Sequence, residues 1–138
     1  MNTFALHHVG IIMPDEQTAN SFLQLFGIAE EYRGYVPEYH ALCIFTKRND
    51  GSAIEFVIPD GGNLTDYNKG KGGIHHIALL VDDIRAAKIE LNEKGIQLLE
   101  ETPVQGAGDF IVNFVRPRYA HGILVELIEN VTGQREIL

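Results

Sequence analysis

An internal repeat is the feature that most constrains how this 138-residue chain folds. The segment LHHVGIIM at positions 6–13 is echoed by IHHIALLV at 74–81, an offset of 68 residues. Acidic residues follow each copy, then apolar residues at helical spacing, then three strand-like runs separated by turn residues. The sequence therefore predicts two similar modules, each in the order strand, helix, strand, strand, strand.

The pattern also predicts where these elements begin and end. We expect one helix from Asp15 to Gly27 and another from Asp83 to Gly95. The strands expected after the helices lie at 30–36, 40–46 and 53–58, and at 96–100, 110–115 and 122–129. We expect a single domain over 1–138, with modules at 4–58 and 74–130 joined by a glycine-rich linker at 59–73. One helix on four strands leaves the other sheet face uncovered, so the two faces need each other or a ligand.

Composition and charge exclude several classes of protein. Apolar residues make up 45% of the chain and charged residues 22%, as in ordinary globular proteins. The net charge of −8 is unlike the basic surface of a nucleic-acid binder. No membrane span or signal peptide is recognisable, so we expect a cytoplasmic protein without nucleic-acid or membrane partners. The single cysteine, Cys43, is expected to be a buried strand residue rather than a nucleophile.

Ionisable residues interrupt the apolar strands at equivalent places in the two modules. His8 and His76 stand in the first strands and Glu55 and Glu126 in the last, all predicted on the sheet face opposite the helix. A carboxylate inside an apolar strand is costly unless a positive or protonated group satisfies it. Two imidazoles and two carboxylates from four strands suit a divalent cation. The alternative is two His–Glu pairs, each hydrogen-bonded internally.

The segments that contain these residues resemble the vicinal oxygen chelate (glyoxalase/bleomycin resistance/dioxygenase) superfamily. They are HHVGI at 7–11, IEFVIP at 54–59, GGIHHIALLVDDI at 72–84 and GILVELIE at 122–129. Within the superfamily the chain is most similar to methylmalonyl-CoA epimerases, and next to lactoylglutathione lyases (glyoxalase I). The resemblance implies an α+β fold of tandem βαβββ modules forming a cupped mixed sheet, a homodimer, and metal ligation by His8, Glu55, His76 and Glu126. Epimerases often carry Gln where Glu55 stands, whereas glyoxalase I usually has Glu.

The resemblance also suggests a base for proton transfer. By this resemblance, Glu38 stands at the position of the glutamate base of the epimerases. The following residues, Tyr39 and His40, differ from the family's usual pattern. We pair Glu38 with the metal-side Glu126, because an epimerase needs groups on opposite faces of a planar intermediate. His40 is a second candidate. The alternative for Glu38 is an exposed acid in a turn.

Basic residues near the end of the chain suggest a substrate contact. The segment NFVRPRYAHG at 113–122 resembles the epimerase loop in which a basic residue after proline holds an acyl carboxylate. Arg118 fits that role, with Arg116 beside it, and Tyr119 stands where a small hydroxyl residue is expected. The alternative for both arginines is a solvated turn charge.

Together these features predict an enzyme that removes and returns a proton next to a carbonyl through a metal-stabilised enolate. We expect one divalent ion (Co, Ni, Zn, Mn or Fe) and a small-molecule substrate of the acyl-CoA or glutathione thioester or hemithioacetal type. The first alternative is a glyoxalase I-like lyase, in which Glu55 and Glu126 shuttle protons between neighbouring carbons. An alternative of another class is a non-catalytic protein that sequesters a small molecule.

Overall fold

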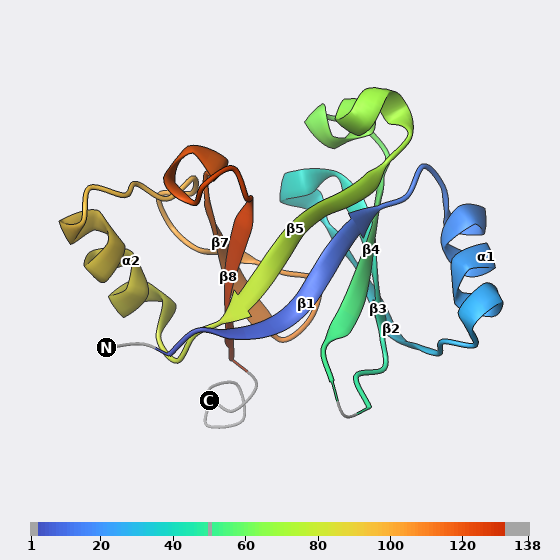
Figure 1. Ribbon diagram of the computed structural model, residues 1–138, viewed down its shortest axis with the longest axis horizontal. Coiled ribbons are helices and arrows are strands. Elements are labelled where there is room, and N and C mark those ends of the chain that lie inside the picture. Colours follow the sequence, from blue (N-terminus) through green and yellow to red (C-terminus); the bar gives the residue numbers. More distant parts are fainter. Residues whose placement is uncertain (1–2, 50, 132–138) are drawn as a thin grey trace. The chain divides into compact units, whose positions relative to one another are not determined.

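The computed structural model describes residues 3–49 and 51–131, which form two compact units (Figure 1). The His8 unit spans His8–His75, and the His76 unit contains the described residues up to His7 and from His76 onward. The division passes through β1 (Ala5–Ile12) and β5 (Gly73–Leu80), each time between two adjacent histidines. That residues 1–138 form one domain stays a prediction.

The His8 unit contains α1 (Glu16–Phe26), β2 (Glu30–Val36), β3 (Ala41–Thr46) and β4 (Ala53–Pro59). Its strands lie in the order β2-β3-β4-β1, with β1 parallel to β4 and the other pairs antiparallel. The carboxylate of Asp15 accepts a hydrogen bond from the Thr18 N–H at 2.7 Å and caps α1, which ends at the left-handed Gly27. The core between helix and sheet consists of Met13, Ala19, Leu23, Ile44 and Phe56.

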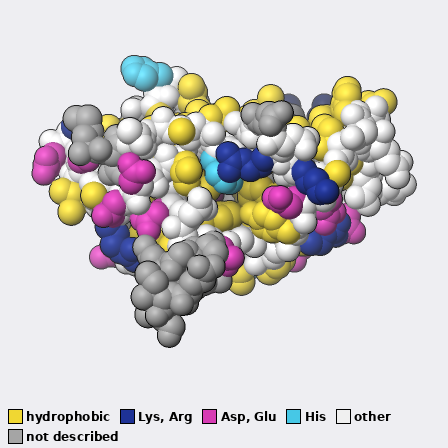
Figure 2. Space-filling view, turned by 90° about the horizontal axis from the view of Figure 1, so that it is seen from below, with side chains coloured by type: hydrophobic (Ala, Val, Ile, Leu, Met, Phe, Trp, Pro, Cys, Tyr) yellow, Lys and Arg dark blue, Asp and Glu magenta, His cyan; other side chains and the backbone are white. Residues whose placement is uncertain are grey.

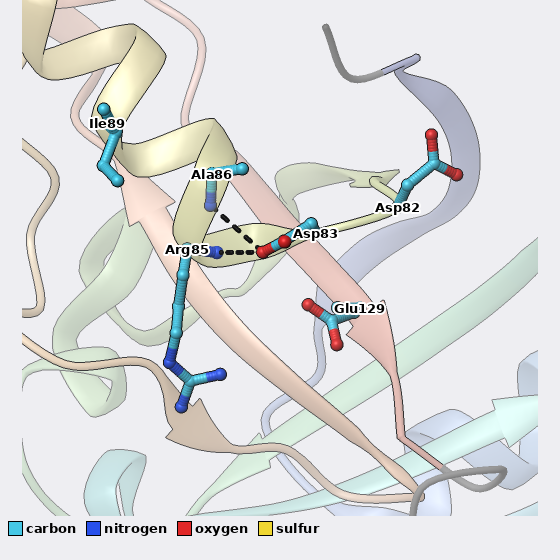
Figure 3. Close-up of a pocket in the computed structure, with 6 residues that line it drawn as sticks. All are labelled: Asp82, Asp83, Arg85, Ala86, Ile89 and Glu129. Atoms are coloured by element: carbon cyan, nitrogen blue, oxygen red, sulfur yellow. Dashed lines mark hydrogen bonds between the residues drawn. The ribbon is translucent and has the colours of Figure 1, made fainter.

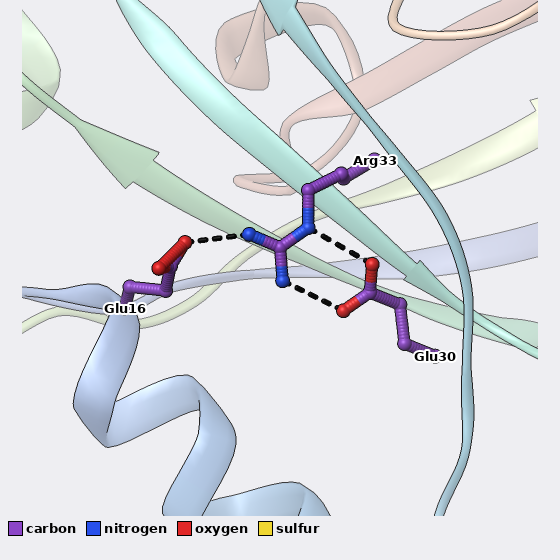
Figure 4. A network of polar contacts seen from close by, with 3 residues as sticks. All are labelled: Glu16, Glu30 and Arg33. Atoms are coloured by element: carbon purple, nitrogen blue, oxygen red, sulfur yellow. Dashed lines mark hydrogen bonds and ion pairs between the residues drawn. The ribbon is translucent and has the colours of Figure 1, made fainter.

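A three-residue ion network joins β2 to the start of α1 (Figure 4). The Arg33 guanidinium donates to both carboxylate oxygens of Glu30, at 2.9 and 2.7 Å, and to Glu16 at 2.6 Å. The network ties strand to helix because Glu30 and Arg33 lie on β2 and Glu16 is the first residue of α1.

The His76 unit repeats this arrangement. It contains α2 (Ile84–Glu93), β6 (Val104–Gln105), β7 (Phe110–Val115) and β8 (Val125–Asn130) in the strand order β5-β8-β7-β6. Strand β5 is parallel to β8, and β8–β7 and β7–β6 are antiparallel. The Asp83 carboxylate caps α2 by accepting from two backbone N–H groups. A separate core contains Val81, Ile84, Ala87, Leu98, Val115, Val125 and Leu127. The predicted α+β fold of tandem βαβββ modules is thus confirmed.

The strand predicted at 96–100 is wrong. Only Leu98 forms a bridge there, with Val115 of β7. The side chain of the fully buried Asn113 binds the Glu100 backbone in place of a strand partner. It accepts from the Glu100 N–H and donates to the Glu100 carbonyl, each at 3.1 Å. The Glu100 carboxylate in turn accepts from the Phe114 N–H at 2.8 Å. Side chains therefore satisfy backbone groups that a longer strand would pair. The regular strand beside β7 is the short β6, which comes later in the chain and pairs with Ile111 and Val112.

Short helical turns connect the strands at three places. These are η1 (Pro37–Tyr39), η2 (Asn63–Gly70) within the predicted linker, and η3 (Pro117–Tyr119). Near η2, Gly72 has φ of 77°, and a β-carbon there would lie 2.2 Å from the Ile12 carbonyl oxygen, so this position requires glycine.

The surface and the helices add two simpler findings. On the face shown in Figure 2, basic side chains lie among acidic and apolar ones. Across the described part of the chain, no helix combines the length and the apolar character needed to span a membrane.

Candidate functional site

The first predicted pair lies in the His8 unit on two neighbouring parallel strands. His8 of β1 is fully buried and Glu55 of β4 is 6% exposed, with 3.2 Å between imidazole Nε2 and carboxylate Oε1. Gly10 is the register partner of Glu55 and shares the sheet face of His8, because side chains two apart on a strand point the same way. Gly10 therefore places no side chain on this sheet face next to His8 and Glu55.

The second predicted pair repeats this geometry in the His76 unit. His76 of β5 is 5% exposed and Glu126 of β8 is 6% exposed, and Nε2 lies 3.4 Å from Oε1. The register partner of Glu126 is Ala78, the equivalent of Gly10. In both units, therefore, a histidine from the first strand meets a glutamate from the last strand beside a small residue.

The donor chemistry of both pairs fits a divalent cation. His8, Glu55, His76 and Glu126 are all buried, and each offers one imidazole nitrogen or carboxylate oxygen as a ligand atom. Imidazole and carboxylate are ligands that zinc, cobalt, nickel, manganese and iron accept. Burial of two carboxylates is costly in the absence of positive charge, and a bound cation offsets that cost.

Each histidine of these pairs also contacts a phenylalanine that the sequence prediction missed. The His8 ring lies 5.1 Å from the Phe45 ring at 88°, and the His76 ring lies 5.6 Å from the Phe114 ring at 85°. Phe45 is the register partner of Glu55 across β3 and β4, and Phe114 is that of Glu126 across β7 and β8. Strand alternation could have found both, because each Phe stands opposite a glutamate on an antiparallel neighbour.

The candidate bases occupy the turn after β2 in the His8 unit. Glu38 lies within η1 and is exposed, and so is the adjoining His40, whose φ of 51° places it in the left-handed region. The His40 carbonyl accepts from the Asp60 N–H at 2.9 Å, which holds this turn to the end of β4. The structure thus presents both candidates at the surface of their own unit.

The candidate substrate-binding arginines lie at η3 in the His76 unit, Arg116 just before the turn and Arg118 within it. Arg116 is half-buried and Arg118 is exposed. Arg118 Nη2 donates to the Tyr119 hydroxyl at 2.7 Å, and the guanidinium carbon lies 4.8 Å from the centre of the Tyr119 ring. The Tyr119 ring itself packs against the core of the unit.

The other histidines of the repeat have aromatic neighbours instead. His7 is buried, with its ring 6.3 Å from that of Phe110, and the His75 ring meets Tyr67 at 5.1 Å and 88°. Packing is the expected role of both side chains, as strand alternation predicts.

A groove of about 420 Å³ lies at the start of α2, away from these histidines (Figure 3). Two of its three acidic residues bind the start of the helix: Asp83 caps α2, and the Glu129 carboxylate accepts from the Ile84 N–H at 2.8 Å. The third, Asp82, accepts from the Thr3 hydroxyl at 3.2 Å. Glu129 and Glu126 project from opposite faces of β8, since they are three residues apart on a strand. The groove is therefore a structural feature of the helix terminus.

Comparison with known proteins gives concordant matches. Residues 7–114 match the family model of the Glyoxalase/Bleomycin resistance protein/Dioxygenase superfamily. The chain is 33% identical over 132 residues to the mitochondrial methylmalonyl-CoA epimerase of Homo sapiens, covering 91% of this chain and 74% of the relative. It is 32% identical over 127 residues to the ethylmalonyl-CoA/methylmalonyl-CoA epimerase of Cereibacter sphaeroides, covering 88% and 95%. A crystal structure of a selenomethionine methylmalonyl-CoA epimerase matches with a TM-score of 0.78 and 31% identity over 91% of this chain and 94% of that one.

Proposed function

Since the chain belongs to the glyoxalase/bleomycin resistance protein/dioxygenase superfamily, we propose that it epimerises a 2-carboxyacyl-CoA of the methylmalonyl-CoA type. The observation that carries the proposal is the pair of buried His–Glu contacts at equivalent positions of the two units. The epimerase relatives make the function epimerase-like, and they do not favour the lyase or the non-catalytic alternative.

We further propose that the two pairs jointly bind one divalent ion through His8, Glu55, His76 and Glu126. Their shared residue types, burial and register support this assignment. Bound there, the ion would supply a Lewis acid for the charge that develops on a substrate carbonyl oxygen. The identity of the ion, among cobalt, nickel, zinc, manganese and iron, depends on the availability of each metal as well as on the ligand type.

The proton-transfer roles are assigned to Glu38 in η1 and Glu126 on β8, and the substrate-binding role to the arginines at η3. Glu38 takes the α-proton, and Glu126 in its protonated form gives a proton to the opposite face of the planar intermediate. The exposed position of Glu38 supports its role as the base. The substrate enters from solvent, and the base must lie within reach of its α-proton. Arg118, with Arg116 beside it, holds the free carboxylate of the substrate by charge-assisted hydrogen bonds. We propose a homodimer as the assembly.

The reaction is tested by proton exchange at the substrate α-carbon. Purified protein is incubated in D₂O with methylmalonyl-CoA and, in parallel, with the glutathione hemithioacetal of methylglyoxal. We expect deuterium incorporation into methylmalonyl-CoA and no conversion of the hemithioacetal. Conversion of only the hemithioacetal would contradict the epimerase assignment. Glu38→Gln should slow exchange by about 10²- to 10⁴-fold, the range for a lost general base, while the exposed Glu31→Gln should not.

The joint metal site is tested by stoichiometry. We expect one ion per chain in the parent protein and its loss in Glu55→Gln and Glu126→Gln. Glu129→Gln is the matched control, because it changes the same kind of buried carboxylate on the other face of β8. If a variant that lacks both His8 and Glu55 kept one tightly bound ion per chain, the two pairs would not share it.

A further inference from the structure

We propose that Phe45 and Phe114 are positioning residues that fix the imidazole planes of His8 and His76 for metal binding. The inference rests on the metal site proposed above and assigns to it two residues that do not themselves bind the ion. Its starting point is a correspondence: each unit contains a His, a Glu and a Phe from three adjacent strands, in the same register.

The ring geometry is nearly the same in the two units. The imidazole and phenyl planes are close to perpendicular, at 88° for His8 and Phe45 and 85° for His76 and Phe114. This edge arrangement at a centroid distance near 5 Å is one that aromatic pairs favour. Both phenylalanines are buried, so each ring contacts an imidazole from which solvent is excluded.

Such a contact controls the direction of a ligand atom. A metal ion binds imidazole nitrogen along the ring plane, so rotation of the ring about its bond to the strand moves Nε2 away from the ion. Hydrogen-bond partners of a ligating imidazole restrain that rotation, and their loss weakens metal binding about 10- to 100-fold. An aromatic ring packed on the imidazole would restrain it by contact, with an effect at the lower end of that range. In each unit a phenylalanine ring whose centre lies 5.1 or 5.6 Å from that of the imidazole would limit this rotation.

The two restraints differ in how the phenylalanine itself is held. Phe45 is 1% exposed and stacks on the other side against Tyr32, its register partner on β2, at 4.9 Å and 13°. Phe114 is 7% exposed, and its backbone N–H is bound by the Glu100 carboxylate. In the His8 unit, Tyr32 on the edge strand β2 therefore helps to hold the Phe45 ring in place.

The experiment uses Co²⁺ binding to the full chain after metal removal, with affinity and visible absorption as readouts. Phe45→Leu and Phe114→Leu remove the ring and keep an apolar side chain. Phe56→Leu and Phe110→Leu are the matched controls, because both are buried, one in each unit, and neither is a register partner of Glu55 or Glu126. We expect about tenfold weaker Co²⁺ binding and a changed spectrum for the first two variants, and parent values for the controls. Tyr32→Leu should give a smaller loss.

The outcomes separate this inference from the function on which it rests. Parent affinity and spectrum in both Phe45→Leu and Phe114→Leu would overturn the positioning role and leave the metal site intact. Equal weakening in all four leucine variants would also overturn it, because general loosening of the core would then be the cause. A parent protein that fails to bind Co²⁺ would overturn the metal site itself, and the inference with it.

Discussion

Tyr119 gives a single arginine a defined position at the surface of the His76 unit. Its hydroxyl accepts a hydrogen bond from Arg118, the guanidinium lies over its ring, and the side chain packs against the core of the unit. A solvated arginine normally loses side-chain entropy when it binds a ligand. If Arg118 binds the substrate carboxylate as proposed, Tyr119 would reduce that loss by holding the guanidinium in place beforehand.

The contact predicts a specific kinetic effect at the residue scale. Tyr119→Phe keeps the ring and removes the hydrogen bond, a change of about 0.5–1.5 kcal/mol, so KM for methylmalonyl-CoA should rise about two- to tenfold with kcat unchanged. Steady-state kinetics measures this. Binding of propionyl-CoA, which lacks the free carboxylate, is the control. An equal loss of affinity for methylmalonyl-CoA and propionyl-CoA would show that Arg118 does not bind the free carboxylate.

At the scale of elements, the link between α1 and β2 depends on pH. The hydrogen bonds from Arg33 hold the pKa of Glu30 below its ordinary value. A carboxyl group whose pKa is lowered on folding stabilises the folded state at pH values above its unfolded pKa. That contribution is lost as pH falls through the lowered value in the folded protein.

The expected outcome concerns Arg33→Met. At pH 7 this variant should be less stable than the parent by about 0.5 kcal/mol, because the pairs are partly exposed. The difference should shrink in acid, once Glu30 is protonated in both proteins. Urea unfolding at pH 7 and in the acid range below pH 4 checks this, with the exposed Arg48→Met as control. A difference that is the same at every pH would contradict the assigned ion pair.

Elements also show what the sequence can and cannot predict. Strand alternation alone places His8 with Glu55 and His76 with Glu126, because both residues of each pair interrupt apolar strands. The helix starts at Asp15 and Asp83 follow from side chains that cap locally. The segment at 96–100 could not be predicted, since the side chain of Asn113 replaces strand pairing through contacts distant in sequence.

For the whole molecule, the ion proposed above would contribute to stability as well as to chemistry. Each unit buries a core of its own, and the proposed ligands come equally from both. A ligand that binds only the folded state stabilises it by about 2.7 kcal/mol at one hundred times its Kd. We therefore expect a chelator to lower Tm of the parent by several degrees.

Calorimetry with and without chelator measures that shift. The double variant His8→Ala, Glu126→Gln is the control, since it lacks one proposed ligand in each unit, and its circular dichroism should match that of the parent. Its Tm should not respond to the chelator. An equal shift in parent and variant would mean that the chelator acts elsewhere.

The division of the chain within β1 bears on the order in which the protein is synthesised. Residues up to His7 belong to the same unit as residues from His76 onward, so all of His8–His75 is translated in between. At ordinary elongation rates this delay is on the order of ten seconds. Every residue of the His8 core is therefore synthesised before any of the residues from His76 onward with which the N-terminal part of β1 shares a unit.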